Sequence, residues 1–236
     1  MEPGTAIAIA AAAILLSRPR VEKSAPKTSK DLVRLLEPIE DAGMLPGFRA
    51  FAQAVARRES SFNNRAKNTS ATEARAAARA YDRAIERGYF RGNTNPRARW
   101  VFGSGGWFGF LPATGLAQGG TDGPFRLGSP DLVFDARSSV AMAAEYAAAI
   151  IRNYLDGVPR QHRTWLAVRR GWASPSLAAD WQEKNERSRA VRQRFELDLM
   201  RCCGLRPADL PLATLGTYRG IGGVIRVLGS DDGPSA

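Results

Sequence analysis

A single glutamate, Glu59, stands where an apolar stretch of the chain ends. The segment from Ala54 to Ala66 reads AVARRESSFNNRA. The carboxyl group of Glu59 therefore lies at the end of the apolar face of an expected helix. Partial burial of a carboxyl group at the wall of a cleft raises its pKa. A carboxylic acid that stays protonated near neutral pH can donate its proton to a glycosidic oxygen. We therefore expect Glu59 to act as a general acid.

A second stretch, from Gly103 to Thr114, combines glycines with aromatic residues and reads GSGGWFGFLPAT. Glycines permit close backbone approach and left-handed turns, and aromatic rings can stack on sugar faces. This stretch fits the opposite wall of a cleft, with Trp107, Phe108 and Phe110 against a sugar. The alternative is that these three rings are core residues, because a cleft wall and a core share side chains.

A third stretch, residues 133–155, contains an acidic turn that leads into a long alanine-rich helix. Most glycosidases use two carboxyl groups, so a partner for Glu59 is needed if the chemistry is of that kind. The candidates are Asp122, Asp131 and Asp135. Nothing in their spacing selects one of them.

Together the three stretches resemble the soluble lytic transglycosylase family, a branch of the lysozyme-like superfamily. The family has a helix that ends in Glu-Ser, followed by an aromatic residue and Asn-Pro-Ala, which correspond here to Glu59, Ser60, Phe62, Asn63 and Ala66. Asn64 occupies the place where proline is common. The resemblance covers roughly residues 47–172.

The second and third motifs of the family follow in the same order. Its Gly-Ala-x-Gly-Leu-Met-Gln and Pro-x-Thr patterns are similar to the residues Gly103, Ser104, Gly106, Trp107, Phe108, Phe110, Leu111, Pro112 and Thr114. Its Asp-Pro turn before a helix with a Tyr-Leu pair is similar to the residues Phe134, Asp135, Ala136 and Tyr146.

The resemblance implies a mainly α, lysozyme-like fold and cleavage of the bond between N-acetylmuramic acid and N-acetylglucosamine in peptidoglycan. In this family one glutamate, here Glu59, protonates the leaving oxygen and then acts as base on the 6-hydroxyl of the sugar, giving a 1,6-anhydro product. No second carboxylate and no cofactor are required. The implied substrate-binding residues are Ser60, Gly106, Trp107, Phe108, Phe110 and Tyr146.

This chain departs from the family at two places. Gly109 stands where the family has glutamine, and the later Ala-Tyr-Asn-x-Gly motif appears as Ala167, Val168, Arg169, Arg170 and Gly171. The tyrosine–asparagine pair that helps to place substrate is therefore missing, and Tyr146 or Tyr154 is a candidate substitute. Simple hydrolysis, as in a muramidase, stays open beside anhydro-ring formation.

Apolar periodicity predicts the elements that hold these residues. We expect helices over residues 31–39, 47–59, 72–87 and 138–155, and a further pair over 175–183 and 185–202. Alternation over Gly222 to Leu228 indicates a strand. Trp165, Trp172 and Trp181 are expected in the core. The adjacent cysteines, Cys202 and Cys203, are interpreted as buried thiols near a helix end.

We expect three regions: an N-terminal apolar anchor and linker (1–30), the lysozyme-like domain (31–205), and a C-terminal extension and tail (206–236). Residues Thr5 to Leu16 read TAIAIAAAAILL, twelve uncharged residues, whereas a membrane span needs about 20. The segment matches a secretory signal poorly, because Glu2 and no basic residue precedes it. Contact with a membrane and contact with a larger protein assembly are both open.

The net charge of the chain indicates which kinds of partner it can bind. The chain has 34 basic and 23 acidic residues, a net charge of +11, which attracts polyanions such as bacterial wall polymers or nucleic acid. No DNA-reading motif is present, so nucleic acid is expected to bind only non-specifically. One histidine and no spaced cysteine–histidine cluster argue against a zinc enzyme. We expect a virion-associated protein, of a phage tail or secretion machine, that acts in the periplasm and cell wall. The alternative is an inactive structural or plug protein.

Overall fold

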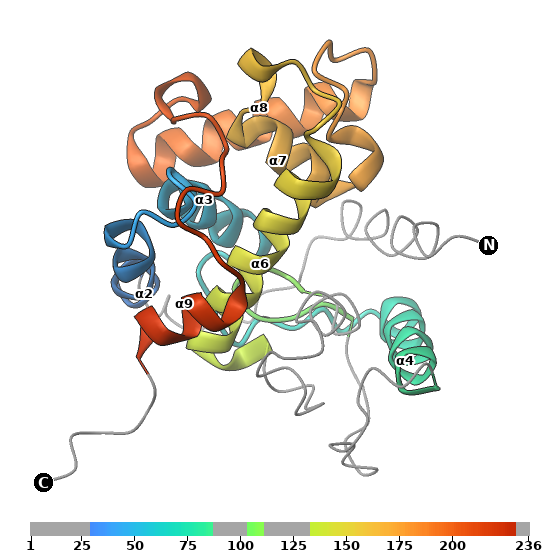
Figure 1. Cartoon of the computed structure of the whole chain (residues 1–236). Coiled ribbons are helices and arrows are strands. Elements are labelled where there is room, and N and C mark those ends of the chain that lie inside the picture. The colour runs from blue at the N-terminus through green and yellow to red at the C-terminus, as the bar shows by residue number, and fades with distance from the viewer. Residues whose placement is uncertain (1–28, 87–102, 111–132, 230–236) are drawn as a thin grey trace, which may run out of the picture.

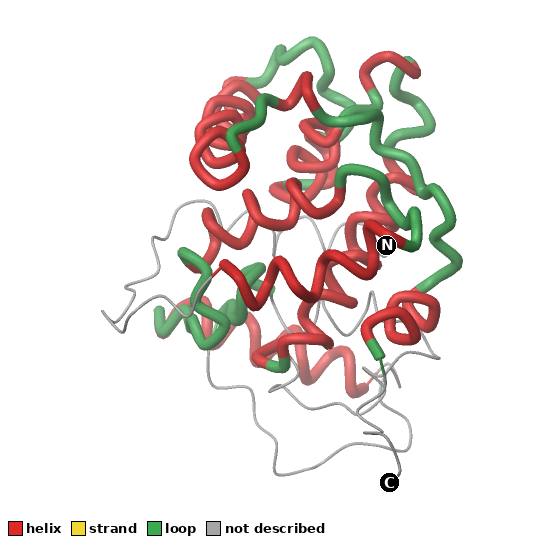
Figure 2. The backbone as a smooth tube through the Cα atoms, turned by 90° about the vertical axis from the view of Figure 1, so that its left-hand side faces the viewer, coloured by secondary structure: helices red, strands yellow, loops and turns green. Residues whose placement is uncertain are grey.

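Helices provide the secondary structure of the described part of the chain. The computed structural model describes residues 29–86, 103–110 and 133–229 (Figure 1). Within them Figure 2 shows helices and loops and no strand. The seven α-helices are α2 (Ser29–Asp41), α3 (Phe48–Ser60), α4 (Ala71–Glu86), α6 (Ala136–Tyr154), α7 (Trp165–Ala173), α8 (Glu186–Cys203) and α9 (Ile221–Leu228). The prediction of a mainly α fold is confirmed for these residues.

Five of the expected helices agree with α2, α3, α4, α6 and α8 to within about two residues, the usual uncertainty of helix ends. Local capping explains several of the boundaries. The Asp135 carboxylate accepts a hydrogen bond from the Ser138 N–H at the start of α6, and the Asn185 side chain accepts one from Arg187 at the start of α8. Gly204, in the left-handed conformation, ends α8.

The strand predicted over Gly222–Leu228 is wrong, because this segment forms helix α9. Val224 and Leu228, four residues apart, are both buried, while Arg226 is exposed. This one-sided burial has the helical period, and α9 packs against α6 and α2. The tertiary contacts therefore override the strand preference of the β-branched residues.

The helix predicted over 175–183 is also wrong. Only Pro175–Leu177 is helical, as one turn of 3₁₀-helix. The Asp180 carboxylate accepts hydrogen bonds from the backbone N–H groups of Lys184 and Asn185 at 3.0 Å each, which stabilises a turn instead. Glu183 adopts a left-handed backbone with φ of 53°, and this conformation ends any helical run.

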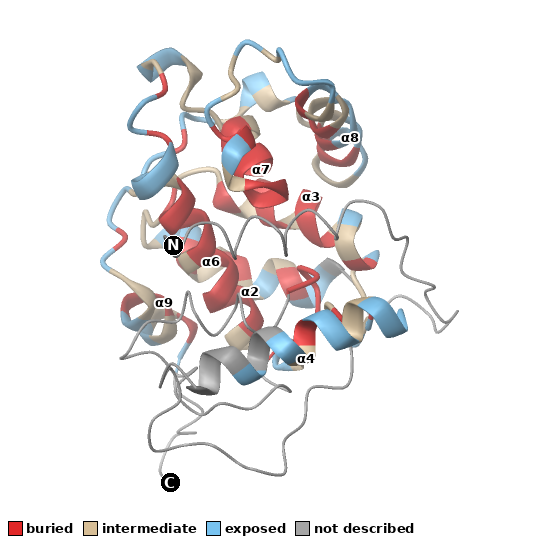
Figure 3. Cartoon of the chain, turned by 90° about the vertical axis from the view of Figure 1, so that its right-hand side faces the viewer, coloured by how far each residue is buried: buried red, intermediate tan, exposed pale blue. Residues whose placement is uncertain are grey.

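The core joins α3, α7 and α8 through aromatic rings. The ring centroids of Phe51 and Trp165 lie 4.7 Å apart, and Phe51 also meets Trp172 and Phe195 edge-on. The predicted core positions of Trp165 and Trp172 are confirmed. Trp181 is half-buried and stacks on His162. Helix α7, which sequence reasoning did not predict, is buried along most of its length (Figure 3).

Helix α6 lies beside α7 at a close contact that requires a glycine. A Cβ atom at Gly171 would lie 2.7 Å from Cγ2 of Ile150 and 3.1 Å from Cβ of Ala178. Real Cβ atoms do not approach so closely, so a larger residue would have to move the two helices apart. The absence of a side chain at Gly171 therefore allows α7 to pack closely against α6.

We expect Gly171→Ala to lower the free energy of unfolding by about 1–3 kcal/mol, the usual cost of overpacking a core. Gly222→Ala is the matched control. Gly222 also lies in a helix, but its Cβ would meet nothing within 4 Å, so this change should leave stability equal or raise it by about 0.5–1 kcal/mol. Urea denaturation of both variants checks the pair. Equal effects would show that the α6–α7 contact yields without cost.

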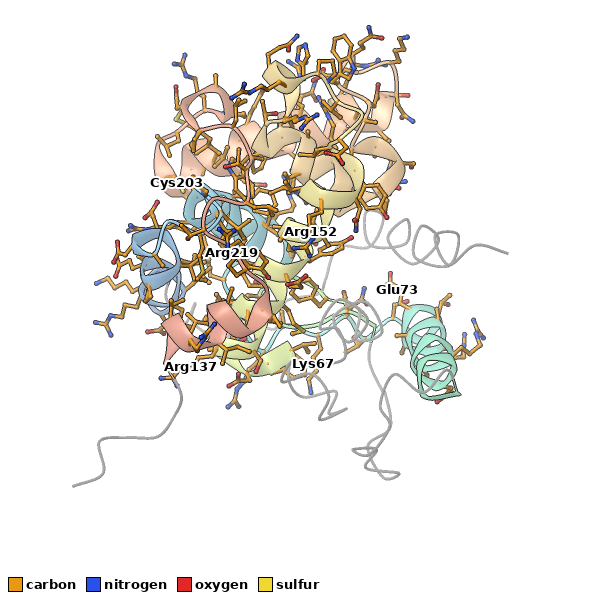
Figure 4. All side chains as sticks on the ribbon, in the orientation of Figure 1. Lys67, Glu73, Arg137, Arg152, Cys203 and Arg219 are labelled. Carbon is orange, nitrogen blue, oxygen red and sulfur yellow. The ribbon has the colours of Figure 1, made fainter. Side chains whose placement is uncertain are left out.

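The described part of the C-terminal extension packs onto the same core as residues 31–205. Ala213, Tyr218, Val224 and Leu228 are buried, and the Leu45 N–H donates to the Leu215 carbonyl. On α6, the Glu145 carboxylate accepts a hydrogen bond from the Tyr218 hydroxyl and pairs with Arg152, which Figure 4 labels. Residues 206–228 are thus continuous with the helical body.

The N-terminal apolar segment, residues 5–16, and nearly all of the linker lie outside the described residues, as does the tail after residue 229. None of the helices in the described ranges has the length and apolar character that crossing a membrane requires. Cys202 and Cys203 occupy the end of α8, as predicted, but both thiols are half-buried rather than buried and both are free.

Candidate active site

Glu59 is the next-to-last residue of α3, at a sharply terminated helix end. The two residues after the helix, Ser61 and Phe62, have φ angles of 52° and 65°, and the Phe62 N–H reaches back to the Ala56 carbonyl. This left-handed termination turns the chain away and leaves the Glu59 side chain 13% exposed. The apolar face of α3, with Phe51 and Val55, is buried directly before it.

The Glu59 carboxylate forms an ion pair with Arg169 of α7. Nη2 of Arg169 donates to Oε1 of Glu59 at 2.9 Å, and the Arg169 side chain is only 7% exposed. Arginine is rarely so buried unless it is paired. Sequence reasoning did not foresee this partner. The available signal was spacing, because Arg169 follows Trp165 by four residues and precedes Trp172 by three, which puts it on the buried face of a helix.

The pKa of Glu59 lies above the ordinary value for a glutamate. Burial is the main cause, because it disfavours the charged carboxylate. The nearby charge of Asp198 acts in the same direction more weakly. Arg169 opposes the rise, first by its charge and then by its hydrogen bond, and Arg58 adds a smaller effect. The site therefore combines a buried carboxyl group that favours its proton with two cations, chiefly Arg169, that limit the effect.

This raised pKa predicts how stability depends on pH. A carboxyl group whose pKa is higher in the folded state binds its proton more tightly there, so its stabilising contribution is present at low pH. That contribution is lost as pH rises from about 4.3, the value for an unfolded glutamate, through the folded pKa. We expect the free energy of unfolding of the wild type to fall over this window relative to that of Glu59→Gln. Urea denaturation of both proteins across pH measures this change. A wild-type free energy of unfolding that rises with pH relative to that of Glu59→Gln would contradict the raised pKa.

The second motif stretch lies directly against Glu59. Gly109 has a left-handed backbone with φ of 61°, and a Cβ atom there would lie 3.3 Å from both Cβ and Oε2 of Glu59. Gly105 and Phe110 exchange two backbone hydrogen bonds across this turn, at 3.0 and 2.9 Å. Gly109 therefore lies against the carboxyl group, and any larger residue at this position would press on Glu59.

Gly106 and Trp107 hold this turn in place. A Cβ atom at Gly106 would lie 2.1 Å from the Val133 carbonyl oxygen, and its φ of 76° also favours glycine. The Gly106 N–H donates to the Ala66 carbonyl, and Nε1 of Trp107 donates to the Phe62 carbonyl at 3.1 Å. These bonds fasten the turn to the segment that follows α3.

The predicted stacking residues Trp107, Phe108 and Phe110 are buried, with exposed fractions of 3%, 1% and 3%. Phe110 packs on Trp172, and Tyr146 meets Trp172 edge-on at 4.7 Å. This placement agrees with the alternative that the aromatic residues belong to the core. A role for them and for the buried Tyr146 in binding sugar stays a prediction.

Two other predicted polar residues are occupied by structural bonds. The buried Ser60 hydroxyl donates to the Ala56 carbonyl at 2.9 Å, within its own helix, so its role in substrate binding also stays a prediction. Asp135 caps α6, and the other candidate carboxylates, Asp122 and Asp131, lie outside the described residues. Asp198 pairs with Arg58 at 2.9 Å and with Arg57 at 3.6 Å.

Among the residues that the structure describes, no group of three or more histidine, cysteine, aspartate or glutamate side chains could hold a metal ion. Comparison of the chain with protein-family models, with curated proteins and with solved structures gave no match.

Proposed function

We propose that this protein is a lysozyme-like glycosidase that cleaves the MurNAc–GlcNAc bonds of peptidoglycan, as a lytic transglycosylase or a muramidase. The observation that carries the proposal is the setting of Glu59. One carboxyl group with a raised pKa stands at a helix end, and the glycine turn of the second motif lies against it. Gly109 of the second motif is far from Glu59 in the sequence but lies against its carboxyl group.

The chemistry needs one residue in two roles. Glu59 donates its proton to the glycosidic oxygen as the bond to the sugar breaks. The resulting carboxylate then accepts a proton from the attacking oxygen. If that oxygen is the 6-hydroxyl of the same sugar, a 1,6-anhydro ring forms, and proximity within one molecule favours this attack. If it is water, the product is a reducing end.

The charge and the N-terminal segment support delivery as part of a larger assembly. A net charge of +11 attracts anionic wall polymers. Residues 5–16 are apolar and fit attachment to a phage tail, a secretion machine or a membrane surface. We propose a virion-associated enzyme that acts locally on the wall.

A second candidate function is that of a structural or plug protein with the same scaffold and no turnover. The Glu59–Arg169 ion pair favours it, because buried ion pairs also serve purely structural roles. The burial of the predicted sugar-stacking rings points the same way.

Digestion of purified peptidoglycan sacculi separates the two candidates. Soluble muropeptides, identified by mass spectrometry, support the glycosidase. A product lighter by one water than the hydrolysed muropeptide identifies the transglycosylase, and the heavier product identifies the muramidase. If neither sacculi nor peptide-free glycan strands are cleaved over a range of pH and salt, the structural candidate replaces the glycosidase.

A further inference from the structure

Arg169 has more hydrogen-bonding capacity than its ion pair uses. A guanidinium group carries five N–H donors in a planar fork that matches a carboxylate. Within the described residues, its side chain makes one hydrogen bond, from Nη2 to Glu59. Both members of the pair keep a small exposed fraction, 7% for Arg169 and 13% for Glu59. The pair thus lies at the edge of the core, with a small part of each side chain exposed.

The ion pair also works against the chemistry proposed for Glu59. An acid catalyst must carry its proton, whereas the Arg169 charge is the largest influence that favours the carboxylate form. The other facing groups do not replace it. Arg58 is paired with Asp198, whose charge acts in the opposite direction. Tyr146 of α6, which is influenced by the Arg169 charge, is a buried phenol whose pKa is raised by burial.

We propose that Arg169 is an anion-binding residue that couples substrate binding to activation: the carboxylate borne by a muramic acid sugar takes Arg169 away from Glu59 and frees Glu59 to act as the acid. This inference rests on the proposed function and names the chemistry that the site selects. Neutral sugars lack the anion, as does muramic acid whose lactyl carboxyl group is amide-linked to a stem peptide, and both leave the pair closed.

The exchange has a definite proton balance. Before binding, the charge of Arg169 favours the carboxylate form of Glu59. When the sugar carboxylate holds Arg169, burial drives Glu59 to take one proton from solvent. Binding of the anionic sugar is therefore accompanied by uptake of up to one proton. Gly109 lies against Oε2 of Glu59, whereas Arg169 donates to the other oxygen, Oε1.

A matched pair of substrates tests this coupling. Peptide-free glycan strands carry a free lactyl carboxylate on each muramic acid, and conversion of this group to the carboxamide removes only the charge. We expect the wild type to cleave and bind the carboxylate form about tenfold better or more, the usual effect of a charged hydrogen bond. Calorimetry in buffers of different ionisation enthalpy should show proton uptake with the carboxylate form and none with the carboxamide.

Substitutions at Arg169 and Glu59 test whether the preference for the carboxylate form arises from this ion pair. Arg169→Gln should bind both strands with similar affinity, and Arg169→Lys should keep part of the preference because it keeps the charge. Glu59→Gln should still prefer the carboxylate form but take up no proton. The wild-type comparison needs no substitution, so it stands even if Arg169→Gln does not fold.

The outcomes separate this inference from the proposed function. If the wild type cleaves both strands equally, the inference is overturned and the glycosidase stands. If it cleaves neither strand but binds the carboxylate form preferentially through Arg169, the anion site stands and the enzyme does not. If it shows neither cleavage nor preference, both proposals fall.

Discussion

Glu59→Gln is expected to lower the rate of peptidoglycan cleavage by a factor of about 10²–10⁴, the usual contribution of a general acid. The amide has nearly the same shape as the carboxyl group and can still accept a hydrogen bond from Arg169, so the fold should be retained. What it lacks is an acidic proton for the glycosidic oxygen. Muropeptide release, followed at equal concentrations of folded protein, measures the loss.

The matched control is Glu40→Gln. This substitution makes the same chemical change, but the Glu40 side chain is 45% exposed and pairs with Arg49 at the surface. Surface pairs contribute about 0–1 kcal/mol to stability, so this variant should cleave peptidoglycan at the wild-type rate. A Glu59→Gln variant that retains full activity would remove Glu59 from the mechanism and return the search to other carboxylates.

Trp165→Ala is expected to lower the free energy of unfolding by about 3–5 kcal/mol, as is usual for loss of a buried large aromatic side chain. Trp165 has no exposed surface, and its ring packs on Phe48 and Phe51 of α3. Its Nε1 donates to the Pro46 carbonyl at 2.8 Å. The substitution would therefore remove the contact that ties α7 to the start of α3. Urea denaturation measures the loss.

Trp165→Phe separates packing from the hydrogen bond. It keeps most of the ring contacts but leaves the Pro46 carbonyl without this donor, which costs about 1–3 kcal/mol. A cost for Trp165→Phe equal to that of Trp165→Ala would show that the hydrogen bond, not the packing, holds α7 in place. A cost near zero for Trp165→Ala would contradict the central position of this ring.

The predictions for Glu59 and for Trp165 are connected through helix α7. Trp165 and Arg169 lie one helical turn apart on α7, so the residue that anchors the helix also places the cation against Glu59. A destabilised α7 should therefore disturb the Glu59–Arg169 pair before the remaining helices unfold, since local openings occur where packing is weakest.

Local patterns in the sequence predicted most of the helices and the candidate acid. The apolar spacing of Phe48, Phe51 and Val55 defines α3 and puts Glu59 at its end, because helical period and chain order are local properties. The aromatic residues of the 103–110 stretch fit either a cleft wall or a core from the sequence, and the structure buries them. Local rules failed for residues 222–228 and 175–183, where burial against α6 and a side-chain turn at Asp180 decided the conformation.

The tertiary structure alone decided which groups meet. Arg169 is 110 residues from Glu59, and no local rule brings them together. Their contact depends on α7 packing against α3 through Trp165, and on Gly171 allowing α7 to approach α6. Glu59 was recognisable as a carboxyl group at the end of an apolar helix. Its partner Arg169 was not foreseeable from the sequence. The burial and raised pKa that the sequence led us to expect are produced by long-range packing, because the pKa of a group depends on its whole surroundings.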